Sequence, residues 1–173
     1  MSDTVLKPSA ITRAHAFALK PDADTCGALA ADLGITGLRK LSFQGQIVPD
    51  GKTDLRLDAQ LGATVVQECV VTAEPVTTRI EEHVLRRYVA NLELPEADEI
   101  EMPEDDTVDP MPEVIDLSEI MAEALALALP PWPRAEGVDP VDLTVTEPGK
   151  APMTDDDAKP FAGLKSLLDK GED

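Results

Sequence analysis

The chain has 173 residues, of which 34 are acidic and 15 are basic, and its net charge is −19. This charge has the wrong sign for a protein that coats nucleic acid broadly or binds an anionic membrane. The length allows one domain of typical size with tails. Residues 1–92 carry 11 acids and 10 bases, whereas residues 93–123 carry 13 acids and no base. The N-terminal half is therefore close to neutral, and the acidity lies in a middle segment and a tail.

Targeting signals are absent from the sequence pattern. The first residues lack the apolar core of a signal peptide, and no run approaches the ~18 apolar residues of a membrane span. Two cysteines, Cys26 and Cys69, are too few for a disulfide framework. We expect a reduced, cytoplasmic protein that does not associate with membranes.

The first predicted elements are short. Residues 1–10 are expected to be a frayed end, and residues 12–19 have the apolar–polar character of a short strand. Asp22 or Asp24 can cap a short helix, and Gly34 is placed to end it as the residue after the C-cap.

A β pattern follows from residue 37 onward. Residues 38–48 predict a strand that ends in a Pro-Asp-Gly turn at residues 49–51. Apolar and polar side chains alternate over residues 55–61, as in a half-buried strand. Residues 64–72 are β-branched and predict a further, more buried strand.

The segment 76–92 fits two structures. In an extended chain Val76, Ile80, Val84 and Tyr88 share one face, and a helix would also bring several of them together. The Thr and Val residues at its start favour a strand.

The C-terminal half alternates between irregular and helical patterns. Residues 93–114 are acidic and contain four prolines, which predicts an irregular solvated loop. Asp116 and Glu119 have the spacing of a capping box for a helix that ends before Pro130. That helix would place three apolar side chains on one face: Ile120, Ala124 and Leu127.

The end of the chain is expected to be a tail. Residues 135–173 are rich in Pro, Asp and Gly, and we expect most of them to be disordered. Near the terminus, Phe161, Leu164 and Leu168 recur at helical spacing. Such a short amphipathic segment on a flexible tail is typical of a docking peptide.

Together these patterns predict an α+β fold. An antiparallel sheet, built mostly from residues 37–92, would be covered by a short N-terminal helix and a longer C-terminal helix. We expect one domain over residues 11–134, with residues 93–114 as an acidic insert and residues 135–173 as an acidic tail.

No motif of a known catalytic or metal site is present. The chain has no Gly-rich phosphate loop, no G-x-S-x-G elbow and no His-Glu-x-x-His. Cys69 is followed three residues later by Thr72 and not by a second cysteine, so the paired spacing of a zinc knuckle is missing. We therefore expect no catalytic residue, no cofactor and no metal, and we interpret Cys69 as a small buried residue of a strand.

Basic residues gather at one place in the sequence. Arg79, His83 and Arg87 are four residues apart and would share one face in a strand or a helix. Arg86 and the pair Arg39–Lys40 could add to this surface. They form either a contact site for a polyanion or an ordinary solvated face whose charges are paired with neighbouring acids. The acidic run is equally open to two interpretations, a soluble insert or an attractor of a basic partner.

Three motifs occur in an order that resembles a known family. Glu-Cys-Val-Val-Thr-Ala-Glu-Pro-Val spans residues 68–76, Ile-Asp-Leu-Ser-Glu spans residues 115–119, and Glu-Ala-Leu-Ala-Leu-Ala-Leu-Pro spans residues 123–130. This order resembles the YceD family, the large ribosomal RNA subunit accumulation proteins of bacteria, over roughly residues 12–170. Many members of that family have a second cysteine where this chain has Thr72.

The resemblance implies a role in accumulation or processing of 23S ribosomal RNA, and it carries over no catalytic residue. Our leading hypothesis is a non-enzymatic assembly factor whose basic residues contact precursor 23S rRNA, while the tail or the acidic loop engages a basic ribosomal protein. The alternative is an acidic escort that binds a basic ribosomal protein without any RNA contact.

Overall fold

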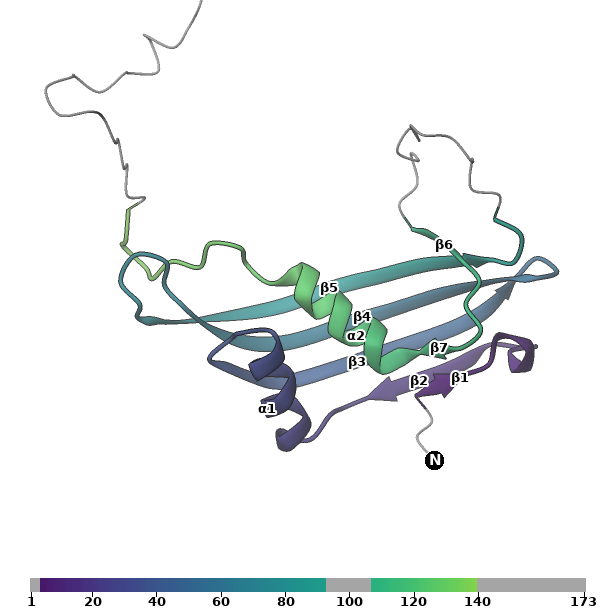
Figure 1. The fold of residues 1–173 in the computed structure, drawn as a ribbon, viewed down its shortest axis with the longest axis horizontal. Helices are drawn as coiled ribbons and strands as arrows, with labels where there is room; N and C mark the ends of the chain where they lie inside the picture. The colour runs from purple at the N-terminus through teal and green to yellow at the C-terminus, as the bar shows by residue number, and fades with distance from the viewer. Residues whose placement is uncertain (1–3, 93–106, 140–173) are drawn as a thin grey trace, which may run out of the picture. The chain divides into compact units, whose positions relative to one another are not determined.

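A computed structural model describes residues 4–92 and 107–139 of the chain, and Figure 1 shows their arrangement. Five strands form a sheet in the order β2-β3-β4-β5-β6, and β1 and β7 form a second, two-stranded sheet. The strands are β1 (Val5–Leu6), β2 (His15–Leu19), β3 (Gly37–Asp50), β4 (Asp54–Glu68), β5 (Pro75–Val89), β6 (Val108–Pro110) and β7 (Ile115–Asp116). The helices are a 3-10 turn at Pro8–Ala10, α1 (Ala23–Asp32) and α2 (Leu117–Ala128).

The sheet is built around three long strands. The turn between β3 and β4 places Gly51 at φ +80°, a backbone conformation that glycine adopts without strain. Residues 55–61 and 64–68 belong to a single strand, β4, so the prediction of a separate strand over residues 64–72 was wrong. The chain leaves the sheet after Glu68 because Cys69–Thr72 forms a turn.

The ambiguous segment 76–92 is a strand over most of its length, as favoured by its composition. Strand β5 pairs with β4 in an unbroken antiparallel register from Leu55–Tyr88 to Glu68–Pro75. Ile80, Val84 and Tyr88 are buried on one side of β5. Period-two burial against a long neighbouring strand, rather than local propensity alone, decided between strand and helix.

Both predicted helices are present with their predicted caps. The side chain of Asp22 accepts a hydrogen bond from the backbone N–H of Thr25, at 2.9 Å, and Gly34 follows α1 at φ +64°. The side chain of Asp116 caps α2 by accepting from the backbone N–H of Ser118, at 2.8 Å, so the cap is present but its partner is not Glu119, as the capping-box spacing predicted. The predicted apolar face of α2 was wrong at one residue: Leu127 is 78% exposed.

Two segments expected to be irregular contain strands. Val5–Leu6 pairs with Ile115–Asp116, so the N-terminal end is not simply frayed. Within the expected acidic loop, Val108–Pro110 adds to β5 as the parallel strand β6. The main sheet is therefore mixed and not purely antiparallel, within an α+β fold. Residues 93–106 of that loop lie outside the described part of the chain.

The two faces of the main sheet differ. One face carries the fully buried side chains of β3 and β4, among them Phe43, Ile47 and Leu57, and α2 lies over β4 and β5 on this face (Figure 1). The other face carries the polar side chains that alternate with them along each strand. No helix in residues 4–92 or 107–139 has the length and hydrophobicity needed to cross a membrane.

Candidate functional site

The basic residues predicted on β5 divide between two faces of the sheet. Arg79, His83 and Arg87 lie on the polar face, which we call the outer face, because they alternate with the buried Ile80 and Val84. Arg86 lies next to Arg87 in the strand, so its side chain points to the opposite face, the side on which α2 lies. The structure therefore brings three of these four residues to one face, and Arg86 does not join them.

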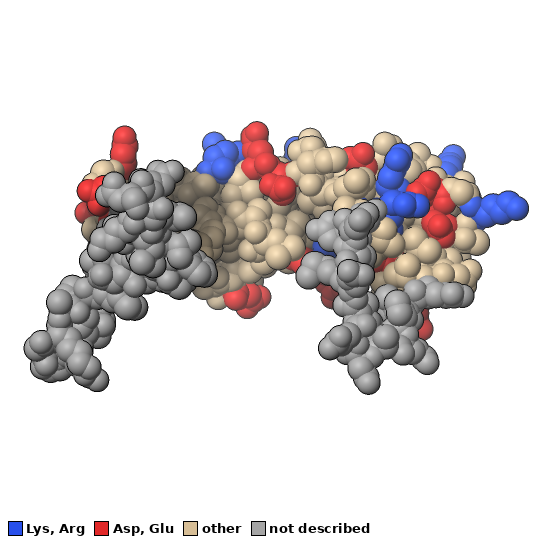
Figure 2. All heavy atoms as spheres, turned by 90° about the horizontal axis from the view of Figure 1, so that it is seen from above, with Lys and Arg blue, Asp and Glu red and all other residues tan. Residues whose placement is uncertain are grey.

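Each basic residue on the outer face of β5 has an acidic partner. The pairs join Arg79 to Glu81 at 3.2 Å, His83 to Asp58 at 2.8 Å, and Arg87 to Asp50 at 3.1 Å. Such exposed pairs stabilise a fold by about 0–1 kcal/mol, but the carboxylates beside Arg79 and Arg87 neutralise surface charge that an anion would meet. Basic and acidic side chains are also interspersed on the side of the molecule seen in Figure 2.

The pair Arg39–Lys40 lies where β3 is irregular. Arg39, Thr64 and Arg79 stand in register on β3, β4 and β5, so their side chains form one row on the outer face. Neighbouring strands are about 4.8 Å apart, which puts the two arginines about 10 Å from one another. Lys40 has φ +52° in a bulge between Arg39 and Ser42.

One basic residue of the outer face was missed in the sequence. Arg56 of β4 stands directly opposite Arg87, and it is exposed. The alternation over residues 55–61 contains the signal, because it assigns Arg56 to the solvated face. Among the residues that the structure describes, Arg39 and Arg56 form no ion pair.

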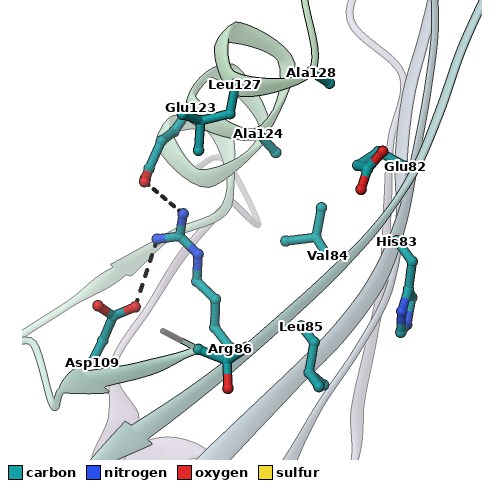
Figure 3. A pocket seen from close by; sticks show the side chains of 11 residues that line it. Glu82, His83, Val84, Leu85, Arg86, Asp109, Glu123, Ala124, Leu127 and Ala128 are labelled. Atoms are coloured by element: carbon teal, nitrogen blue, oxygen red, sulfur yellow. Dashed lines mark ion pairs between the residues drawn. The ribbon is translucent and has the colours of Figure 1, made fainter. Parts of the chain in front are cut away.

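Arg86 forms a separate, half-buried cluster between β5, β6 and α2 (Figure 3). Its guanidinium lies 2.7 Å from a carboxylate oxygen of Glu123 and 3.9 Å from one of Asp109. Burial disfavours the charge of Arg86, but the hydrogen bond and attraction from Glu123 outweigh it and raise its pKa. Burial also raises the pKa of the neighbouring Tyr88 hydroxyl, against the opposing effect of Arg86. The cluster joins the helix to two strands and leaves Arg86 with no charge to offer a ligand.

A pocket of about 460 Å³ opens beside this cluster, between β5 and the last turn of α2 (Figure 3). Its walls carry both apolar and charged side chains, among them Glu82, Val84, Arg86, Ala124, Leu127 and Ala128. Three carboxylates and one guanidinium line it. The last turn of α2 contains no basic residue, so the partial negative charge of its free carbonyl groups is uncompensated there. The pocket is therefore negative and has an apolar wall.

Cys69 lies in a turn and not in a strand, although it is buried as predicted. Its Sγ accepts hydrogen bonds from the backbone N–H groups of Thr72, at 3.5 Å, and Ala135, at 3.4 Å. Hydrogen bonds from Thr72, and then from Ala135, lower the pKa of the thiol to about 7. In residues 4–92 and 107–139 no three His, Cys, Asp or Glu residues come together as metal ligands.

The predicted docking segment with Phe161, Leu164 and Leu168 lies outside the described residues.

Comparison with models of known protein families gave a match. The model of the family described as large ribosomal RNA subunit accumulation protein YceD matches residues 57–168. Neither the curated proteins nor the solved structures contain a match to the chain.

Proposed function

Because the chain belongs to the YceD family of large ribosomal RNA subunit accumulation proteins, we propose that it supports 23S rRNA accumulation as a non-enzymatic factor that binds a basic ribosomal protein. The family match supports the connection to large-subunit rRNA. The distribution of charge on the folded part favours a basic protein over RNA as the direct partner.

The observation that carries this proposal is the pairing of the basic residues on β5. An RNA-binding surface needs cations that are free to replace the counterions of phosphates. Arg79, His83 and Arg87 are each held by a carboxylate on the outer face, and Arg86 is held by two carboxylates on the other side. The same ion pairs leave a surplus of acidic side chains, which attracts cationic partners and repels RNA.

The surroundings of the histidine on β5 support a non-enzymatic role. The His83–Asp58 pair, at 2.8 Å, has the geometry of two members of a catalytic triad. Both side chains are about half exposed on an open strand face. Within the described residues no Ser, Thr or Cys side chain hydrogen-bonds to this histidine, so it has no nucleophile to activate.

The test uses the full chain and two purified probes: large-subunit ribosomal proteins separated from rRNA, and 23S rRNA transcripts. We expect the chain to elute together with one or more basic ribosomal proteins on a sizing column, and to bind rRNA weakly in filter binding. Tight rRNA binding without any ribosomal protein in the complex would overturn the proposal. Ribosomal proteins that are themselves acidic serve as the matched control and should elute separately.

A second candidate function, direct rRNA contact, is favoured by two arginines of the outer face that form no ion pair with any described residue. Arg39 and Arg56 lie on the same side of the sheet as Arg79 and Arg87. Contact with three or four phosphates would give a slope of about −2 to −4 in a plot of log affinity against log salt. Replacing Arg39 and Arg56 by Ala would then flatten the slope, whereas the protein-binding proposal predicts no change.

A further inference from the structure

The long strand β5 is the open edge of the main sheet over most of its length. Strand β6 covers only the end of β5, from Arg87 to Val89. Among the described residues, no strand pairs with residues 75–86 on the side away from β4. This edge spans roughly 40 Å at about 3.3 Å per residue, which is long for an edge that proteins usually shorten or cover.

The hydrogen bonds to β6 show which backbone groups face this edge. The N–H of Arg87 donates to Thr107, at 2.7 Å, and the carbonyl of Val89 accepts from Met111, at 3.0 Å. Successive residues of a strand point their N–H and C=O groups to opposite sides, and the register of β5 has no break. The backbone N–H and C=O groups of five further odd-numbered residues therefore face away from β4: Thr77, Arg79, Glu81, His83 and Leu85.

The single proline of β5 fits this assignment. Pro75 is odd-numbered like these five residues, so its backbone nitrogen faces away from β4. The absence of an N–H there removes no hydrogen bond to β4. Each of the five therefore presents a donor and an acceptor at the spacing that only another extended backbone matches.

The pocket beneath α2 lies directly beside this edge. Its lining includes Glu82, Val84 and Arg86 of β5 and the exposed Leu127 of α2. A strand added to β5 would direct every second side chain to this side of the sheet, against the apolar wall. The carboxylates of Glu82, Asp109 and Glu123 outnumber the one guanidinium there, and the end of α2 adds partial negative charge.

We infer that residues 75–86 of β5 bind an extended, Lys- or Arg-rich peptide segment as an additional strand, with alternate side chains in the pocket beneath α2. The backbone of β5 supplies the hydrogen bonds, and the acidic pocket selects a cationic segment over an acidic one or a nucleic acid. The identity of the partner rests on the proposed function. The binding mode rests on the edge and the pocket alone.

The first experiment follows amide hydrogen exchange by NMR in the full chain, with a short peptide of alternating Lys and Val as the probe. In the free protein the amides of residues 77, 79, 81, 83 and 85 should exchange fast, while those of the even-numbered residues between them are already protected by β4. Adding the peptide should slow the odd-numbered set by about tenfold or more, as hydrogen-bonded amides are protected. A peptide of alternating Glu and Val is the control and should leave the pattern unchanged.

Two variants test the binding mode separately. Leu85→Pro removes one outward N–H and no bond to β4, and its matched control Leu85→Ala removes the same side chain but keeps that N–H. One lost hydrogen bond should weaken peptide binding by about tenfold in Leu85→Pro only. Leu127→Lys places a positive charge in the pocket, where it would repel the cationic side chains of the peptide, and should also weaken binding. Val70→Lys adds the same charge at another exposed apolar residue and should leave binding unchanged.

The outcomes separate the two proposals. Suppose that the wild-type chain binds large-subunit ribosomal proteins and that the Leu85→Pro and Leu127→Lys variants bind them equally well. The proposed function then stands, and this inference is overturned. If the Lys–Val peptide binds with alternating protection but no ribosomal protein does, the inference stands and the proposed function falls. Slow exchange of the odd-numbered amides in the free protein would show that the chain or a second copy already covers the edge, which overturns the inference.

Discussion

The orientation of α2 makes a sharp prediction because two leucines of the same helix have opposite surroundings. Leu125 is fully buried, whereas Leu127, two residues later, is 78% exposed. Replacing either by Ala removes the same atoms and changes helix propensity by the same small amount. Any difference between Leu125→Ala and Leu127→Ala in the free energy of unfolding therefore reports burial alone.

The expected magnitudes are well separated. Leu125→Ala leaves a cavity beneath α2 and should lower the free energy of unfolding by about 3–5 kcal/mol. Leu127→Ala should change it by less than about 0.5 kcal/mol, as for other surface substitutions. A loss of 3 kcal/mol is a large share of the roughly 5–15 kcal/mol that stabilises a typical domain.

Urea unfolding followed by circular dichroism measures both changes. For a slope of about 1.5 kcal/mol per molar urea, Leu125→Ala should move the midpoint down by about 2–3 M, and Leu127→Ala should leave it in place. Equal losses in the two variants, or a larger loss in Leu127→Ala, would refute the orientation of α2. Loss of peptide binding by the stable Leu127→Ala variant would connect this leucine to partner binding and not to folding.

Four further predictions concern other parts of the fold. Gly27→Ala, inside α1 with open space around the glycine, should stabilise by about 0.5–1 kcal/mol, whereas Gly34→Ala should destabilise because its φ is +64°. In an absorbance titration at 240 nm, the Cys69 thiolate should appear near pH 7 and that of the buried Cys26 above the ordinary range. Because the pKa of Cys69 is lowered only in the folded state, the free energy of unfolding should rise from about pH 7 to about pH 9, and Cys69→Ser should abolish this rise. Asp116→Ala should lower the free energy of unfolding, measured by thermal unfolding, by about 1 kcal/mol. Asp116→Asn, which can still cap α2, should lower it much less.

The elements that the sequence predicts well are those that local chemistry decides. Asp22 and Asp116 cap their helices within three residues, and Gly34 and Gly51 occupy positive-φ positions that follow from turn geometry. The alternation along β4 identifies the buried side of the strand directly. None of these features needs information from a distant part of the chain.

The candidate site was predicted only in part, because ion pairing depends on register. The sequence grouped Arg86 with Arg79 and Arg87 by their closeness, but strand parity sends Arg86 to the side of α2. Its partners, Glu123 and Asp109, come from segments far along the chain.

The same distinction holds for the charge of the whole molecule. The sequence by itself determined that the net charge is −19, that the acids gather after residue 92, and that a β pattern precedes them. Only the tertiary structure decided which bases are neutralised and that, among the residues it describes, β5 has an open edge beside an acidic pocket. The physical reason is that local pattern fixes which side of a strand is buried, whereas the pairing of strands and helices fixes which charges meet and which backbone groups stay free.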